Sequence, residues 1–122
     1  MLHPTGTDIN IITANVHNFT EKVIKASFQK PVLVDLWAEW CSPCRVIAPI
    51  LQQFVRSYED DILLVKVEVD EGDGENMKLA GHYRVRGFPT VILFIDGEEK
   101  ARFSGARPLP FIRQFMDENI NT

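Results

Sequence analysis

The segment VLVDLWAEWCSPCR, residues 32–45, decides the fold of this chain. Its first six residues are apolar except for Asp35, a pattern typical of a central strand that is covered on both faces. Apolar residues then recur at helical spacing from the cysteines to about Tyr58, so we expect a long helix directly after the strand. Pro49 lies inside that helix and should kink it.

Cys41 and Cys44 are the only cysteines of the chain. Residues three apart share one face of a helix's first turn, so the two sulfurs are close enough to bond reversibly. A disulfide that closes so short a loop restrains the unfolded chain only weakly, and chemistry explains the pair better than stability does. A structural zinc site needs four ligands, and His3, His17 and His82 are scattered. A lone Cys-x-x-Cys among alternating strands and helices therefore indicates a dithiol redox centre without a metal.

The bulk properties fit one ordinary globular domain. The chain has 122 residues, of which 45% are apolar and 25% charged. A net charge of −4 without a basic patch argues against nucleic-acid and membrane partners. Residues 1–8 look like a flexible tail, and residues 9–122 form the expected single domain. The N-terminus has no secretory signal, so a complete chain of this sequence would stay in a reducing cytoplasm.

Strands and helices are expected to alternate on both sides of the central segment. A short strand at 9–12 and a helix to about residue 27 precede it, and Asp96-Gly97 is a hairpin signal near the C-terminal end. The elements expected after the long helix are strand 62–69, helix 77–83, strands 90–95 and 99–103, and helix 108–120. The order β-α-β-α-β-α-β-β-α predicts an α/β fold whose central mixed sheet of four to five strands is flanked by four helices.

The motif residues resemble those of the thioredoxin family over about residues 9–120. The matching residues are Asp35, Trp37, Ala38, Glu39, Trp40, Cys41, Pro43, Cys44, Pro49, Gly87, Phe88, Pro89, Thr90, Asp96, Gly97 and Gly105. The resemblance implies a thioredoxin fold and a thiol–disulfide oxidoreductase that reduces protein disulfides. It also implies a monomer without a bound cofactor, which thioredoxin reductase recharges with electrons from NADPH.

The two cysteines then take different roles. Cys41 lies where the helix begins, and the positive end of the helix dipole there stabilises a thiolate. We expect Cys41 to be exposed and to attack the substrate disulfide, and Cys44 to be buried and to resolve the mixed disulfide. Pro43 presets the backbone of the helix's first turn.

Asp35 has two interpretations. It could be a surface aspartate at a strand edge, or one that a lysine satisfies. The apolar strand around it instead predicts a buried carboxyl with a raised pKa. The resemblance places Asp35 beneath Cys44, where it could accept that thiol's proton and return it later, and it makes Lys66 the residue that tunes Asp35.

The resemblance also predicts a cis peptide bond before Pro89, opposite the disulfide, which leaves the Phe88 backbone free to pair with an extended substrate. Trp40 and Phe88 could instead be ordinary core residues, although large exposed aromatics usually mark a contact site. The residues expected to bind substrate are Trp40, Ser42, Pro43, Phe88, Pro89, Gly105 and Ala106.

Three features depart from the family pattern. Ser42 replaces the usual glycine, and its hydroxyl could hydrogen-bond near the Cys41 sulfur. Arg45 replaces the usual lysine, and the loop 71–76 is a few residues longer than in ordinary thioredoxins. A longer loop could alter the choice of partner.

Two other functions compete with a disulfide reductase. One is a binding module, such as the thioredoxin-like domain of a chaperone-type protein. The other is an oxidase or isomerase, which is less consistent with the sequence because such relatives often carry a histidine between the cysteines. Ser42-Pro43 lacks that positive charge.

Overall fold

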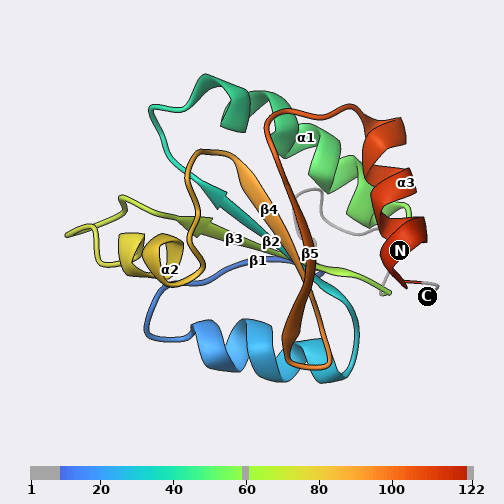
Figure 1. The fold of residues 1–122 in the computed structure, drawn as a ribbon, viewed down its shortest axis with the longest axis horizontal. Coiled ribbons are helices and arrows are strands. Elements are labelled where there is room, and N and C mark those ends of the chain that lie inside the picture. Colours follow the sequence, from blue (N-terminus) through green and yellow to red (C-terminus); the bar gives the residue numbers. More distant parts are fainter. Residues whose placement is uncertain (1–8, 59–60, 121–122) are drawn as a thin grey trace, which may run out of the picture.

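The protein is built around a five-stranded mixed sheet with strand order β1-β3-β2-β4-β5 (Figure 1). The computed structural model describes residues 9–58 and 61–120, so the predicted tail at residues 1–8 lies outside the described residues. The elements are β1 Ile11–Thr13, η1 Thr20–Lys25, η2 Ala26–Phe28, β2 Val32–Trp37, α1 Ser42–Arg56, β3 Leu63–Glu68, α2 Met77–His82, β4 Thr90–Ile95, β5 Glu98–Ser104 and α3 Leu109–Ile120. Strands β1, β3 and β2 are parallel, and β4 and β5 are antiparallel to their neighbours. The predicted fold class and element order are confirmed.

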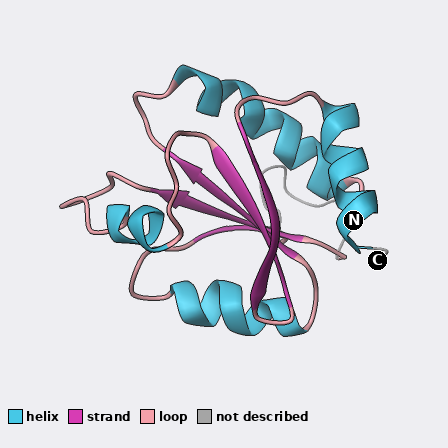
Figure 2. Cartoon of the chain, in the orientation of Figure 1, coloured by secondary structure: helices cyan, strands magenta, loops and turns pink. Residues whose placement is uncertain are grey.

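Helices cover both faces of the sheet (Figure 2). Side chains alternate along a strand, so each central strand contributes to two cores. Leu33 of β2 and Leu93 of β4 pack in a cluster with residues of α1 and α3. Val34 of β2 and Ile92 of β4 pack in a second cluster with residues of η1 and α2. No helix among the described residues is long and apolar enough to cross a membrane.

The first helix has an unexpected geometry. The sequence predicted a helix up to about residue 27, but η1 is a π-helical turn and η2 is a 3₁₀ turn. The Ser27 hydroxyl donates to the carbonyl oxygen of Ile24 at 2.7 Å, a carbonyl that a continuing α-helix would use for its own ladder. The apolar spacing thus predicted the position of this element but not its π and 3₁₀ geometry.

The predicted hairpin joins β4 to β5 through Asp96 and Gly97, whose φ values of 52° and 85° are both positive. This turn is attached to the first helix. The Asp96 N–H donates to the Ser27 carbonyl oxygen at 2.9 Å, and the Gly97 N–H donates to the Ser27 hydroxyl at 2.8 Å. The end of the sheet opposite the cysteines is therefore held by hydrogen bonds to the backbone and side chain of Ser27.

Candidate active site

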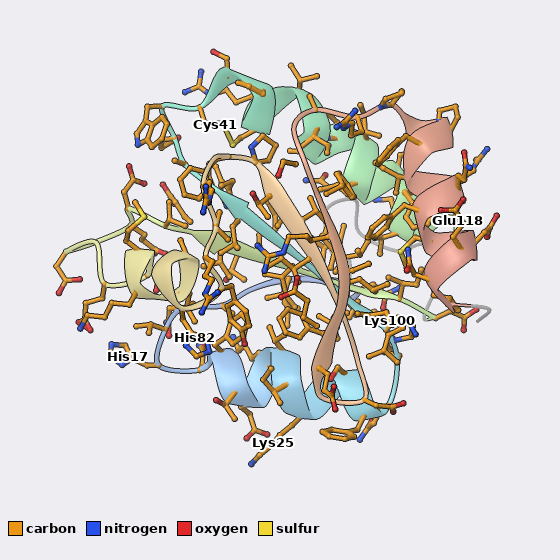
Figure 3. All side chains as sticks on the ribbon, viewed as in Figure 1. His17, Lys25, Cys41, His82, Lys100 and Glu118 are labelled. Atoms are coloured by element: carbon orange, nitrogen blue, oxygen red, sulfur yellow. A yellow bond between two sulfur atoms is a disulfide. The ribbon has the colours of Figure 1, made fainter. Side chains whose placement is uncertain are left out.

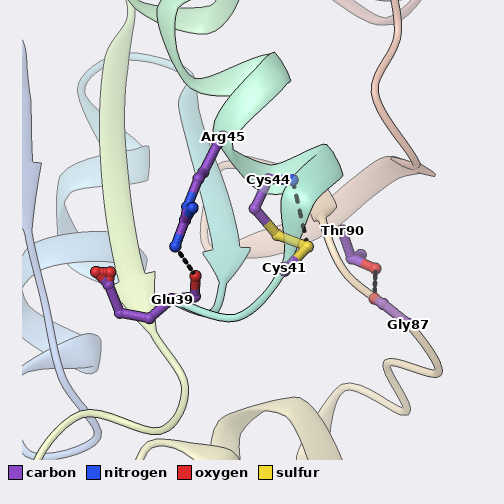
Figure 4. The surroundings of a disulfide bond; sticks show 6 residues. All are labelled: Glu39, Cys41, Cys44, Arg45, Gly87 and Thr90. Atoms are coloured by element: carbon purple, nitrogen blue, oxygen red, sulfur yellow. Dashed lines mark hydrogen bonds between the residues drawn. A yellow bond between two sulfur atoms is a disulfide. The ribbon is translucent and has the colours of Figure 1, made fainter.

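The two cysteines form a disulfide at the start of α1, with their Cα atoms 5.3 Å apart (Figure 4). Cys41 is the N-cap of the helix and has an extended backbone, with φ −97° and ψ 106°. The backbone N–H of Cys44 donates to the Cys41 sulfur at 3.2 Å. One of the free N–H groups at the helix start is thus aimed at the sulfur that would carry a negative charge in the reduced form.

Both cysteines are buried in the disulfide form. Cys41 is 5% exposed and Cys44 is 2% exposed. The prediction of an exposed Cys41 is therefore wrong for this form, although Cys44 is the more buried of the two as expected. The sulfur of Cys41 is bonded back into the first turn of α1, which removes it from solvent.

Asp35 is buried in the middle of β2, with 1% of its surface exposed. Neither of its carboxylate oxygens has a hydrogen-bond partner among the described residues. Burial raises the pKa of Asp35 to about 7, and the positive charge of Lys66 opposes that rise. The alternatives of a surface aspartate and of one satisfied by a lysine are both wrong, because the group is buried and no residue that the structure describes forms an ion pair with it.

Lys66 lies beside Asp35 on the neighbouring strand. The register of β2 and β3 pairs the Cα of Asp35 with that of Lys66. The Lys66 ammonium nitrogen lies 5.1 Å from the centroid of the Trp37 ring. The structure thus brings together the two residues that the resemblance joined.

The Phe88–Pro89 peptide bond is cis, as predicted. The Pro89 carbonyl oxygen accepts the Gly105 N–H at 3.0 Å, which joins the cis-proline turn to the end of β5. The Thr90 hydroxyl donates to the Gly87 carbonyl oxygen at 2.6 Å, and Figure 4 shows this pair in the surroundings of the disulfide. Strand pairing therefore holds the turn beside the cysteines.

An aromatic pair lies on the surface next to this turn. Trp40 is 65% exposed, so the interpretation as an ordinary core residue is wrong for it. Its ring and the ring of the half-buried Phe88 are 6.0 Å apart between centroids, edge to face. Ala106 is exposed and Gly105 is half-buried. The predicted substrate-binding residues thus include an apolar surface that is open to a partner.

Ser42 and Arg45, which replace the usual residues of the family, differ in the contacts that they make. Ser42 and Pro43 are exposed, and Ser42 forms no hydrogen bond with a described residue, so its suggested bond near the Cys41 sulfur is not found. The Arg45 guanidinium donates to the Glu39 carbonyl oxygen at 2.6 Å (Figure 4). That bond fixes the loop that leads from β2 to the disulfide.

The sequence-based reasoning missed Glu68, at the end of β3. It lies two residues beyond Lys66, and its Cα is paired with that of Trp37. Its place near Lys66 and Trp37 follows only from the register of β2 and β3, which cannot be read from the sequence. Among the described residues, no three His, Cys, Asp or Glu side chains are placed to hold a metal ion.

The site lies at the end of the molecule opposite Lys25 of the first helix (Figure 3). A disulfide between residues three apart, at a helix start and beside an exposed aromatic surface, can exchange with another disulfide. The bonds that form and break in thiol–disulfide exchange join sulfur atoms only. The fold and the site therefore define the class of this protein, which is a thiol–disulfide oxidoreductase.

Comparison with known proteins identifies the family. The family model described as Thioredoxin matches residues 10–118, and the chain belongs to the thioredoxin family. It is 40% identical over 111 residues to "Thioredoxin" of Pseudomonas aeruginosa, covering 91% of this chain and 97% of that protein. It is 36% identical over 102 residues to "Thioredoxin 1" of Synechococcus elongatus, covering 84% and 90%. It is 37% identical over 110 residues to "Thioredoxin C-2" of Corynebacterium nephridii, covering 90% and 96%. None of these findings favours a chaperone-type binding module.

Proposed function

We propose that this protein reduces disulfides in other proteins, with Cys41 as the attacking thiol and Cys44 as the resolving thiol. The observation that carries the proposal is the Cys41–Cys44 disulfide at the start of α1, with the Cys44 N–H on the Cys41 sulfur. The same N–H and the helix dipole would stabilise a Cys41 thiolate after reduction. The disulfide in the structure corresponds to the state that follows reduction of a substrate.

In the first step the Cys41 thiolate attacks one sulfur of the substrate disulfide. A mixed disulfide forms between Cys41 and that sulfur, and the substrate's second sulfur leaves as a thiolate that takes a proton from water. The exposed Trp40 and the half-buried Phe88 would hold the substrate. Its extended backbone would pair with that of Phe88 beside the cis bond to Pro89.

In the second step Cys44 attacks the Cys41 sulfur. Asp35 takes the Cys44 proton, the intramolecular disulfide forms again, and the first substrate sulfur leaves and is protonated. The substrate gains two electrons and two protons, and the dithiol of the protein loses them. A buried carboxyl with a pKa of about 7 suits this role, because it can both accept and return a proton near neutral pH. Lys66 tunes Asp35 from the neighbouring strand.

The oxidised protein must then receive two electrons. We propose thioredoxin reductase as the partner that supplies them, using NADPH that does not bind to this chain. The setting would be the cytoplasm, where such a monomer, with one domain over residues 9–122, would carry electrons and maintain redox homeostasis. Membership of the thioredoxin family supports this proposal.

Insulin reduction coupled to thioredoxin reductase and NADPH tests the proposed function. We expect NADPH-dependent precipitation of insulin with the wild-type protein and background rates with Cys41→Ser. A wild-type rate equal to that of Cys41→Ser would refute the reductase function.

A trapping experiment tests the roles of the two cysteines. Without its resolving thiol, Cys44→Ser should accumulate mixed disulfides through Cys41, detectable by mass spectrometry. Cys41→Ser is the matched control and should trap nothing. Trapping through Cys44 in that control would show that the two roles are reversed.

A further inference from the structure

Lys66 shares one face of the sheet with two carboxylates, that of Asp35 on the neighbouring strand β2 and that of Glu68 further along its own strand β3. The register pairs Asp35 with Lys66 and Trp37 with Glu68, and side chains two residues apart point to the same face of a strand. Asp35 is inside the molecule, whereas Glu68 is half-buried at the end of the strand. Lys66 thus has a buried carboxylate on the neighbouring strand, its inner side, and a half-buried carboxylate at the end of its own strand, its outer side.

The ammonium group of Lys66 is in close contact with neither carboxylate. Within the described ranges no ion pair joins Lys66 to Asp35 or to Glu68. Its nitrogen instead lies over the Trp37 ring, 5.1 Å from the centroid, in cation–π contact. Yet its charge acts on both acids, since it opposes the rise in the pKa of each. The position of Lys66 thus decides how much its charge stabilises ionised Asp35.

The other charged groups near Asp35, Lys66 and Glu68 lie at the outer end of β3, around Glu68. Burial raises the pKa of Glu68, and the carboxylates of Glu39, Glu71 and Asp70 raise it further. The neighbouring β4 contributes the apolar Val91, whose Cα is paired with that of Asp35. The packed apolar cluster on the inner side holds no other charged side chain among the described residues. Negative charge beyond Lys66 is therefore concentrated at the outer end of β3.

The backbone of Glu68 is fixed in place. Its carbonyl oxygen accepts the side-chain N–H of the buried Asn76 at 3.0 Å, and the Oδ1 atom of Asn76 accepts the Val16 N–H at 2.7 Å. The end of β3 is thereby attached to the loop after β1. The backbone that carries the Glu68 side chain is consequently held in position by hydrogen bonds.

We propose that Glu68 is a positioning residue whose carboxylate attracts Lys66 toward the outer end of β3 and so holds the ammonium away from Asp35. The proposal rests on the proposed function, in which Asp35 takes the proton of Cys44. An ammonium free to approach Asp35 would stabilise the carboxylate and lower its pKa. Asp35 would then be ionised at neutral pH but would be a weaker base toward the thiol.

The test is a carbon-13 NMR titration of the Asp35 carboxyl in the oxidised, full-length protein. Glu68→Gln should lower the midpoint of that titration by roughly half a pH unit or more, because Lys66 is then free to approach Asp35. Glu68→Asp keeps the charge and should restore most of the wild-type midpoint. Glu98→Gln, which removes an exposed carboxylate at the start of β5, should leave the midpoint unchanged.

A double substitution separates action through Lys66 from direct repulsion. Lys66→Met alone should raise the midpoint, the opposite direction to Glu68→Gln. Adding Glu68→Gln to Lys66→Met should change nothing further, since the intermediary is gone. An unchanged midpoint in Glu68→Gln, or an equal decrease with and without Lys66, would overturn the proposal. The titration uses no substrate. A negative result in it can therefore be distinguished from a negative result in the insulin assay.

Discussion

Trp40 and Phe28 are two aromatic residues with nearly the same exposure and different expected roles. They are 65% and 63% exposed, but only Trp40 adjoins the disulfide. We predict that Trp40→Ala lowers kcat/KM for insulin roughly 5- to 30-fold, because about 1–2 kcal/mol of apolar contact with the substrate is lost. The free energy of unfolding of Trp40→Ala should differ from that of the wild type by less than about 0.5 kcal/mol, since an exposed side chain contributes little to stability.

Phe28→Ala is the matched control for that prediction. It removes a similarly exposed ring next to the β4–β5 hairpin, far from the cysteines in sequence and on another element. Its kcat/KM for insulin should equal that of the wild type. An equal loss in both variants would mean that Trp40 has no specific place in substrate binding.

The residues of the site were predictable to different degrees. Cys41, Cys44 and the buried Asp35 stand in one continuous segment, so spacing and an apolar context were enough to single them out. Glu68 was missed because its relation to Lys66 and Trp37 exists only across strands. The burial of Cys41 was missed because a bonded sulfur turns back into the helix, whereas sequence position indicates only that the residue is at a helix start.

Among the elements, β2 and α1 were predicted almost to the residue. Strand β2 is a continuous apolar run that is buried on both faces, and α1 has an apolar stripe of helical period that packs on the sheet. The first helix had a weaker pattern, and its 3₁₀ turn contains Ser27, whose hydroxyl bonds to the hairpin 70 residues away in sequence. Bonds of that range leave no local signal in a sequence.

Gly97 lies where the hairpin contacts the first helix, and we predict that its replacement lowers stability. A Cβ at this position would lie 2.5 Å from the Phe28 ring, and the φ of +85° is unfavourable for other residues. Gly97→Ala should destabilise the protein by roughly 1–2 kcal/mol in urea denaturation, almost all of it the backbone cost, because the exposed Phe28 ring can turn away from the new methyl group.

Gly74→Ala is the control for the backbone cost alone. Gly74 has a φ of +82°, and nothing lies within 4 Å of the Cβ position. Its substitution should therefore cost about the same, roughly 1–2 kcal/mol. A clearly larger loss of stability in Gly97→Ala than in Gly74→Ala would show that the Phe28 ring resists displacement.

At the scale of the whole molecule, the sheet separates two apolar clusters, and one ionisable carboxyl lies inside. Asp35 is the only charged side chain that is buried in the described part of the chain. It shares its face of β2 with Leu33, which packs beneath α1 and α3. A carboxyl that ionises near neutral pH thus places an unfavourable charge in the core, and the stability of the entire fold becomes dependent on pH.

The pKa of Asp35 is raised from 3.8 to about 7 on folding, so between these values the folded chain keeps a proton that the unfolded chain has lost. The stabilisation is complete below about pH 4 and is lost as the pH rises to about 7. Asp35→Asn cannot ionise, so its free energy of unfolding should exceed that of the wild type by roughly 2–4 kcal/mol at pH 8 but not at pH 4. Urea denaturation of the oxidised proteins measures this, with Asp117→Asn on the exposed side of α3 as a control without such a gain. A gain of equal size at both pH values would show that ionisation of Asp35 is not its cause.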